Sequence, residues 1–486
     1  MRRLPRSPVL LCLALALRLA TPVSEMVSQT VAQAAQQPWA LRGTVVTPSG
    51  PIADATVLID GSSILAVGRD LALPAGTRVV TTDGVIYPGL IDLHNHVTWN
   101  ALPRWSSGAK SGARYDWQQL PEYQMALGAP HQKMVAEGHG CAAERYAEVK
   151  AIVGGATAQA GLNPDDLTVP VSVSGAASGP AAIPPDCLGG WVRELGVSSR
   201  LFPKGAQEPL RYEVFPLALD PANTQAILDG LHRGAILSAL FHIAEGDATN
   251  ASARREFGML KARGLLVPGV SIIHGVALSP ANFAEMAKAH VGLVWSPRSN
   301  FELYGQTANL DAAFREGVTV SLAPDWSPTG SDNMWEEIQY AWNVSSQDLD
   351  GLYSSRQLIE MASSVPARVA WIDDKVGTLA PGMYADFFLV QDTPDGPASD
   401  FYDAILVKPI ADIDLVVIDG IPVYGDPAML KSLSIPTEPL KLCGKEKALN
   451  STALPNGPFA QVEARLSAKM KALGSELGPL DSCPQP

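Results

Sequence analysis

The sequence predicts an α/β fold: a TIM-like (β/α)8 barrel with a small composite β-sandwich domain formed by N- and C-terminal segments. Two observations predict it. Strand-like and helix-like runs alternate from residue 85 to residue 371, as in a parallel sheet whose strands are joined by helices. Short β-branched runs with turn signals flank this region, over residues 39–84 and 372–426. Because the barrel interrupts them, we expect the two flanks to complete one sandwich.

Composition excludes several classes of protein. The chain has 486 residues, of which 47% are hydrophobic and 17% charged, so it is neither a disordered acidic chain nor a coiled coil. Lys and Arg number 36 against 49 Asp and Glu, a net charge of −13. This deficit of positive charge argues against nucleic acid as a partner and leaves a cationic or neutral small molecule as the expected one.

Residues 1–34 read as a signal peptide. Arg2, Arg3 and Arg6 precede an apolar run from Pro8 to Leu17 that is too short to cross a bilayer. The small-residue pattern Ala32-Gln33-Ala34 marks a cleavage site, although it lies far from the apolar run. No other segment approaches about 18 uninterrupted apolar residues. We therefore expect a protein exported to the periplasm or secreted, without a membrane anchor, and the sequence is compatible with a homo-oligomer.

The cysteines that follow the signal are even in number, which predicts two disulfides in an oxidising compartment. Four cysteines allow three pairings. We favour Cys141–Cys187 and Cys443–Cys483, since each pair closes a loop in a region poor in regular structure. Four buried thiols are the alternative.

The elements follow in order along the chain. The first flank holds the strand-like runs ALRGTVVTPSG, ATVLIDGSSILAVG and TRVVTTDG. YPGLIDLHNH and AIVGGATAQ supply two barrel strands, and an insertion rich in Trp, Tyr and Gly, residues 97–141, lies between them and is expected to cover the pocket.

Five strand–helix units come next. Their strands are YEVFPLAL, ILSALFHIAEG, VSIIHGVAL, VGLVWSPRSN and TVSLAPDWS, and their helices are expected at 222–232, 251–265, 281–290, 310–316 and from 333. That makes seven strands, and the eighth belongs in the Gly- and Pro-rich stretch 162–209, because such a run closes most readily at eight.

The chain ends with the second flank and a tail. VGTLAPGMYADFFLVQD and DIDLVVIDGIPVYG are the strand-like runs of the second flank. The tail, residues 427–486, carries Val462, Leu466, Met470 and Leu473 at helical spacing, which predicts one docked surface helix.

Candidate metal ligands lie at strand ends. His94 and His96 end an apolar strand, where residues two apart face the same way. His242, His274 and Asp325 each end another predicted strand, and a barrel collects its catalytic groups at that edge. Three imidazoles and one carboxylate suit one divalent metal, Zn²⁺ or Fe²⁺.

A metal at such a site would lower the pKa of its bound water towards about 7, which creates hydroxide at neutral pH. A proton shuttle must then serve the leaving group. Glu245 lies three residues after His242 and is placed to do so. Its alternative role is that of a surface carboxylate at a helix start.

Several motifs together resemble the amidohydrolase superfamily, in the branch of cytosine, guanine and S-adenosylhomocysteine deaminases and triazine hydrolases. They are YPGLIDLHNH, FHIAEG, IHGVALS, WSPRSNFELYG and LAPDWSPTGSDN, and the resemblance spans about residues 40–425. It implies that His94, His96, His242 and Asp325 bind one metal, with Asp325 also catalytic, that Glu245 is the proton shuttle, and that His274 orients water or substrate.

The sequence departs from the superfamily pattern at three places. YEVFPLALD lacks the lysine that bridges two metals in binuclear members, which favours a mononuclear site. LAPDWS replaces the more usual GTD, and HIAEG has Gly where Ser or Thr often follows the glutamate. The resemblance therefore predicts the type of reaction more strongly than the identity of the substrate.

Substrate-binding candidates lie close to these motifs. Arg298 can clamp a carboxylate or phosphate, or form an internal salt bridge. Asn300 can hold a polar ligand edge or cap a helix. Trp99, Trp295 and Trp326 near strand ends suggest a flat substrate, with loop packing as the alternative.

The expected function is metal-dependent hydrolysis of a carbon–nitrogen bond other than a peptide bond, in a heterocyclic amidine or a cyclic amide. Zinc is the first choice of metal and iron the second. One alternative is hydrolysis of a peptide-like amide or a carbon–halogen bond. The other is a non-catalytic binding protein, which should have lost one of the ligands or Glu245, whereas all are present.

Overall fold

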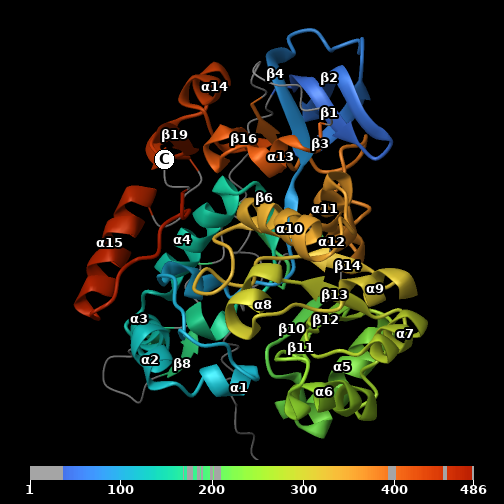
Figure 1. Cartoon of the computed structure of the whole chain (residues 1–486). Coiled ribbons are helices and arrows are strands. Elements are labelled where there is room, and N and C mark those ends of the chain that lie inside the picture. Colours follow the sequence, from blue (N-terminus) through green and yellow to red (C-terminus); the bar gives the residue numbers. More distant parts are fainter. Residues whose placement is uncertain are drawn as a thin grey trace, which may run out of the picture. The chain divides into compact units, whose positions relative to one another are not determined.

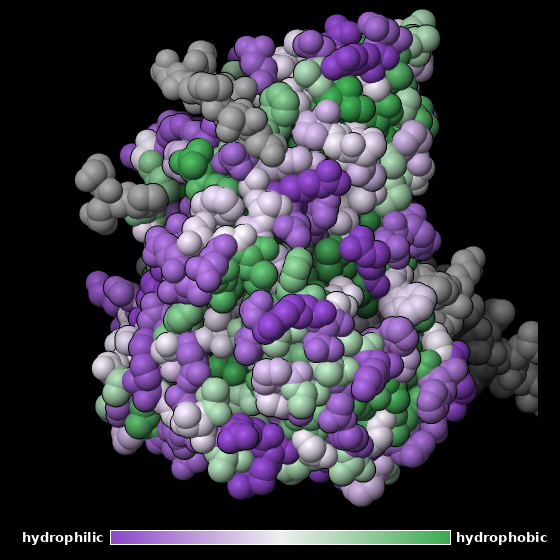
Figure 2. All heavy atoms as spheres, turned by 45° about the vertical axis from the view of Figure 1, so that its right-hand side comes forward, coloured by the Kyte–Doolittle hydropathy of each residue, from purple (hydrophilic) through white to green (hydrophobic). Residues whose placement is uncertain are grey.

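The computed structural model describes residues 37–483 apart from 168, 172–178, 183–186, 188–189, 197–200, 202–208, 392–400 and 453–456 (Figure 1). The expected signal peptide and its cleavage site lie outside the described residues. On the face drawn in Figure 2, hydrophilic side chains are spread between smaller apolar areas, as on an ordinary globular protein.

Parallel strands form the barrel in two hydrogen-bonded arcs of three and five strands. The arcs consist of β5 (Leu90–Asp92), β6 (Ala156–Gln159) and β9 (Arg193–Glu194), and of β10 (Leu210–Glu213), β11 (Ser238–Ile243), β12 (Val270–His274), β13 (Gly292–Trp295) and β14 (Val320–Leu322). A parallel bridge between Asn95 and Asp325 joins the ends of β5 and β14. The predicted barrel is thereby confirmed, and β9 is the eighth strand that the sequence pattern did not locate.

Helices cover the outside of the barrel strands. They are α5 (Pro221–Arg233), α6 (Ala251–Ala262), α7 (Pro280–Lys288), α8 (Pro297–Tyr304), α9 (Leu310–Glu316), α10 (Met334–Asp348), α11 (Ser355–Met361) and α12 (Ser364–Val369), with η6 (Pro216–Ala218) before α5. Side chains of Asp220, Asn250 and Ser279 cap the N-termini of α5, α6 and α7. On β11, Phe241 packs toward the helices and Leu240 packs in the barrel interior. Because residues two apart on a strand share a face, His242 points inward like Leu240.

The two flanks share one sheet, as predicted, but hydrogen bonds join all nine of its strands rather than two facing sheets. The strands are β1 (Trp39–Thr47), β2 (Gly50–Asp60), β3 (Ser63–Gly68), β4 (Arg78–Pro88), β15 (Phe387–Val390), β16 (Ile413–Ile418), β17 (Ile421–Gly425), β18 (Thr437–Leu442) and β19 (Lys445–Asn450), in the order β18-β19-β17-β16-β15-β4-β1-β2-β3. Antiparallel pairing of β4 with β15 connects the N-terminal and C-terminal pieces.

The tail contributes more than the one helix expected. Besides α15 (Phe459–Ala472), it forms α14 (Pro427–Ser432) and the hairpin of β18 and β19 at the edge of the sheet. That hairpin reads TEPLKLCGKEKALN, and its charged residues, which protect an edge strand from pairing with other chains, also hide its strand character. On α15 the expected apolar face is buried through Val462, Leu466 and Met470.

The insertion after β5 is built from short helical segments. They are η2 (Val97–Ala101), α1 (Arg114–Trp117), α2 (Pro121–Tyr123), η3 (Gln124–Gly128) and α3 (Ala129–Ala136). The buried helix α4 (Gly140–Val153) follows and leads into β6. The remaining short elements are η4 (Pro164–Leu167), β7 (Val169–Val171), β8 (Gly179–Ala182), α13 (Ala404–Val407) and η7 (Ile410–Asp412).

Both favoured disulfides are formed. Cys141, at the start of α4, is bonded to Cys187, and Cys443, in the β18–β19 turn, is bonded to Cys483. Among the described residues, no helix has the length and apolar character of a membrane span.

Candidate active site

Four of the predicted ligands converge at the C-terminal end of the barrel. Nε2 of His94 lies 3.1 Å from Nε2 of His242 and 3.2 Å from Oδ1 of Asp325. Nε2 of His96 lies 3.3 Å from the same carboxylate oxygen. The structure thus brings together side chains that follow β5, β11 and β14.

This geometry fits a divalent metal ion. A tetrahedral zinc ion with nitrogen and oxygen ligands at about 2.1 Å places the ligand atoms about 3.4 Å apart, close to these three separations. The ligand atoms form two overlapping groups, His94 with His96 and Asp325, and His94 with His242 and His274. Oδ1 of Asp325 is buried and has no hydrogen-bond partner among the described residues. A buried carboxylate oxygen surrounded by imidazole nitrogens needs a cation, so the donor set suits the expected metal.

The protonation of the histidines also suits a metal site. Nδ1 of His242 lies 3.2 Å from the backbone oxygen of Glu213, and because a carbonyl only accepts, Nδ1 carries the proton and Nε2 the lone pair. Nδ1 of His94 contacts Oγ of Ser296 at 2.6 Å. Burial lowers the pKa of His94 to about 4, and burial together with the nearby His94 holds the pKa of His242 well below 6.5. Both imidazoles are therefore neutral at pH 7, as metal binding requires.

Two residues at the site have a left-handed backbone conformation, which changes the direction of their side chains. His274 has a φ of 68° and Asp325 a φ of 71°, values that non-glycine residues seldom adopt. Ile273 faces the barrel interior, so if side chains alternated strictly along β12, the next residue, His274, would point outward toward the helices. The backbone N–H of Asp325 donates to the backbone oxygen of His94 at 2.9 Å, which holds the strained turn in place.

Glu245 lies beside the ligand cluster and is held from two sides. Its Oε1 accepts a hydrogen bond from the hydroxyl of Tyr304 at 2.6 Å, and that hydroxyl accepts one from Nε1 of Trp117 at 3.0 Å. Its Oε2 lies 3.5 Å from Nη1 of the fully buried Arg114 and 3.7 Å from Nε2 of His274. Both Arg114 and Trp117 belong to α1, so the insertion positions this carboxylate.

Asn300 orients His274 instead of contacting the pocket. Nδ1 of His274 lies 2.8 Å from Oδ1 of Asn300. The amide nitrogen of Asn300 donates to Oγ1 of Thr307 at 3.1 Å, and Nε1 of Trp295 donates to the same oxygen at 2.7 Å. This network sets the amide orientation, so Nδ1 of His274 is the donor and its Nε2 is free to accept. Asn300 thus takes neither of the two roles considered from sequence, and Trp295 is a packing residue.

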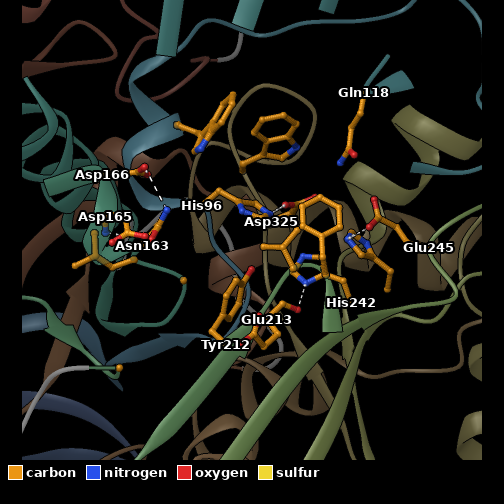
Figure 3. A pocket seen from close by; sticks show the side chains of 18 of the residues that line it. His96, Gln118, Asn163, Asp165, Asp166, Tyr212, Glu213, His242, Glu245 and Asp325 are labelled. Atoms are coloured by element: carbon orange, nitrogen blue, oxygen red, sulfur yellow. Dashed lines mark hydrogen bonds and ion pairs between the residues drawn. The ribbon is translucent and has the colours of Figure 1, made fainter. Parts of the chain in front are cut away.

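A cavity of about 810 Å³ opens in front of the cluster (Figure 3). Aromatic side chains form much of its wall, and Trp99 and Trp326 are among them, as predicted from their place near strand ends. The insertion contributes Trp117, Gln118, Tyr123 and Gln124, and the loop after β6 contributes Asn163, Asp165 and Asp166. Trp99 stacks on His131 with ring centroids 3.8 Å apart, which fixes its plane.

Arg298 is not part of this cavity. Its guanidinium forms an ion pair with Glu336 and lies over the ring of Tyr340, 5.7 Å from the centroid. The structure therefore gives the internal salt bridge, the second of the two roles considered, because the side chain leaves α8 on the side that packs against α10.

Sequence reasoning did not find several residues at the site. Tyr304 lies within a quoted motif, but nothing local marks its contact with Glu245. Arg114 lies in the insertion, 131 positions from Glu245, and carries no local signal. Tyr212, at the end of β10, also lines the cavity, and burial raises its pKa well above 10.

Comparison with known proteins identifies the domain. Residues 227–423 match the model of the amidohydrolase family. The chain is 30% identical over 190 residues to a 5-methylthioadenosine/S-adenosylhomocysteine deaminase of Desulforudis audaxviator, an alignment of 37% of this chain and 44% of that protein. It thus spans less than half the length of that relative. The corresponding deaminase of Moorella thermoacetica is 24% identical over 404 residues, which cover 78% of this chain and 91% of that one.

Solved structures share the fold. A triazine hydrolase from Arthrobacter aurescens has a TM-score of 0.65 at 17% identity, covering 89% of this chain and 99% of that chain. An adenosine deaminase from Xanthomonas campestris, with zinc bound, has a TM-score of 0.64 at 16% identity, covering 90% and 98%. The chain therefore contains an amidohydrolase-family domain over residues 227–423, within a fold that it shares with these solved structures.

Proposed function

We propose that this protein is a zinc-dependent deaminase that removes an exocyclic amino group, as ammonia, from a nitrogen heterocycle. The observation that carries the proposal is the convergence of three imidazole nitrogens and Oδ1 of Asp325, with the Glu245 carboxylate beside them. The deaminase relatives support ammonia as the product. Zinc in a structure of the same fold supports the choice of metal.

A divalent metal held by His94, His96, His242 and Asp325 would lower the pKa of its bound water towards neutrality and polarise the reacting group. The carboxylate of Glu245 accepts a proton from this water and delivers it to the departing nitrogen. Nε2 of His274 carries the lone pair and accepts a hydrogen bond from the same water, which orients the attack. Tyr304 and Arg114 hold Glu245 in one orientation, so its oxygens remain aimed at the reacting atoms.

The cavity wall favours a flat substrate. Trp99, Trp326 and Phe215 present ring surface, and planar heterocycles stack on aromatic rings at separations of about 4.5–7 Å. A volume of about 810 Å³ accommodates a nucleoside-sized molecule. The relatives named for 5-methylthioadenosine and S-adenosylhomocysteine make these two compounds the first substrates to test.

The test combines elemental analysis with an ammonia assay. We expect about one zinc per chain in purified protein, with iron as the other metal to measure. Ammonia release is followed with 5-methylthioadenosine, S-adenosylhomocysteine, adenosine and guanine. Protein that retains no divalent metal, or zinc-loaded protein that releases no ammonia from any of these compounds, would contradict the proposal.

A second candidate keeps the site and changes the bond. A structure of the same fold is an atrazine chlorohydrolase, which supports hydrolysis of a carbon–halogen bond as the second candidate, with water replacing chloride on a similarly flat ring. Chloride release from a chlorotriazine without ammonia release from the amino heterocycles would support this candidate against deamination. A non-catalytic relative is disfavoured because the full ligand set and Glu245 are assembled.

We also propose that the protein is exported. Two disulfides support an oxidising compartment, since they do not persist in a reducing cytosol. N-terminal sequencing of protein from the periplasm or medium tests this proposal, with a start near residue 35 as the expected result. Full-length protein found only in the cytosol would contradict it.

A further inference from the structure

Tyr212 lies near the C-terminal end of β10 and faces the interior of the barrel, beside the ligand candidate His242. It pairs with Leu240 of β11, and its ring packs on the interior core of the barrel. Two residues beyond Leu240, on the same face of β11, lies His242. The ring of Tyr212 stands edge-on to His242 and His96, with centroid distances of 5.5 and 6.1 Å.

The hydroxyl of Tyr212 is buried and has no hydrogen-bond partner among the described residues. A hydroxyl left in this state destabilises the folded protein, whereas phenylalanine at the same place would carry no such penalty. Tyr212 lines the cavity, and Figure 3 shows its hydroxyl turned toward the ligand cluster, on the opposite side of His242 from Glu245. The hydroxyl is therefore placed to bond to a molecule that occupies the cavity.

We propose that Tyr212 is a catalytic hydrogen-bond donor, whose hydroxyl donates to the substrate atom that gains negative charge when water adds to the reacting carbon. That atom is a ring nitrogen in an amino heterocycle and the carbonyl oxygen in a cyclic amide. The proton stays on the tyrosine oxygen throughout, while Glu245 carries the transferred proton to the leaving nitrogen from the other side. This inference rests on the proposed hydrolysis at the same site.

A donor aimed at developing charge acts mainly on turnover. Removing one such preorganised donor lowers kcat by about 10²–10³-fold in enzymes where it has been tested. The contact is weaker in the ground state, where the same atom is nearly neutral, so KM changes little. Specificity follows from the same contact, since only substrates with an acceptor adjacent to the reacting carbon benefit from it.

The experiment compares Tyr212→Phe with a matched control, Tyr424→Phe. Tyr424 lies on β17 in the nine-stranded sheet and also has a buried hydroxyl without a partner among the described residues, but it does not line the cavity. In zinc-loaded protein we expect Tyr212→Phe to lower kcat for ammonia release at least about 100-fold with KM within about 3-fold. Metal content and the thermal midpoint should be equal to or above those of the unmodified protein. Tyr424→Phe should leave kcat unchanged.

Acetohydroxamate provides a readout that needs no substrate. It places an anionic oxygen at a metal site, and its affinity for zinc-loaded protein can be measured by calorimetry. We expect Tyr212→Phe to weaken binding by about ten-fold or more, the effect of one hydrogen bond to a charged oxygen, and Tyr424→Phe to leave it unchanged.

Each result has a defined meaning. If the unmodified protein releases no ammonia, the proposed function fails, and acetohydroxamate binding alone decides the role of Tyr212. If the unmodified protein is active, unchanged kcat in Tyr212→Phe overturns the inference while leaving the proposed function intact. A lower thermal midpoint with unchanged acetohydroxamate affinity would show a packing role and would also overturn it.

Discussion

Replacing Glu245 by glutamine separates proton transfer from the hydrogen bond that this side chain accepts from Tyr304. The glutamine oxygen can still accept the hydrogen bond from Tyr304, now 2.6 Å from Oε1, so the side chain keeps its orientation. What disappears is the basic carboxylate oxygen that lies 3.7 Å from His274. The ligand cluster is untouched, because Glu245 is not among the side chains that surround Oδ1 of Asp325. We therefore expect full metal content, a native fold and lost turnover.

The size of the loss follows from the role. General acid–base catalysis by one positioned group contributes about 10²–10⁴-fold, so kcat should fall by at least about 10²-fold, equivalent to about 2.7 kcal/mol in the activation free energy. The assay measures ammonia release at saturating substrate, together with zinc per chain by elemental analysis. Activity within about five-fold of the unmodified protein, at equal zinc content, would refute the assignment of Glu245 as the shuttle.

Glu256→Gln is the matched control. Glu256 is as buried as Glu245, each 4% exposed, and also contacts Arg114, with Oε1 3.5 Å from Nη2. It does not line the cavity, and its other oxygen accepts a hydrogen bond from the backbone N–H of Ala244 at 2.7 Å. Both variants remove one charge beside the same arginine, so they should destabilise the protein to a similar degree. Only Glu245→Gln should abolish turnover, and a comparable loss in both would indicate that charge beside Arg114, not proton transfer, controls the rate.

Other predictions concern the metal, pH and the disulfides. Asp325→Ala should leave less than half of the normal metal content, and an unchanged ratio of metal to protein in elemental analysis would contradict its role as a ligand. Burial raises the pKa of Glu337 to about 8, so the folded protein keeps a proton that the unfolded chain releases above pH 4.5, and stability falls as pH rises from 4.5 to 8. Glu337→Gln should reduce this fall, which is at most about 4 kcal/mol between pH 5 and pH 8, and urea unfolding at the two pH values with equal losses in both proteins would refute the linkage. Denatured oxidised protein should show no free thiols among the four mature cysteines, and four titratable thiols would contradict both disulfides. Reduction should destabilise the protein by up to about 4 kcal/mol per bond, because the bonded residues are 46 and 40 positions apart.

Most of the barrel could be anticipated from local patterns. The strand–helix alternation predicts β11 to β14, because these strands are buried on both faces. The expected strand YEVFPLAL overlaps the half-buried β10 only at Tyr212 and Glu213, and the short helix α8 was not expected. The two-residue strand β9 escaped because it lies in a stretch of Gly and Pro. The β18–β19 hairpin escaped because alternating charged residues at a sheet edge lack the apolar pattern of a strand.

The site was anticipated unevenly. His94, His96, His242 and Asp325 follow barrel strands, so their place at one edge is a consequence of parallel strands in register. Arg298, by contrast, follows a strand in sequence but leaves its helix on the outer side. Proximity to a strand end therefore predicts which loop a residue occupies and not the direction of its side chain.

The sequence by itself determined the fold class and predicted that the candidate ligands and Glu245 lie at one edge of the barrel, because both depend on periodicity and on the shared edge of parallel strands. Only the tertiary structure decided the partner of each polar group. Arg114 reaches Glu245 across 131 positions because the insertion packs over the pocket, and Asn300 turns toward His274 because Thr307 holds its amide. Among the residues that the structure describes, the hydroxyl of Tyr212 lacks a partner for the same reason: contacts between distant segments are set by packing, which no local pattern in the sequence encodes.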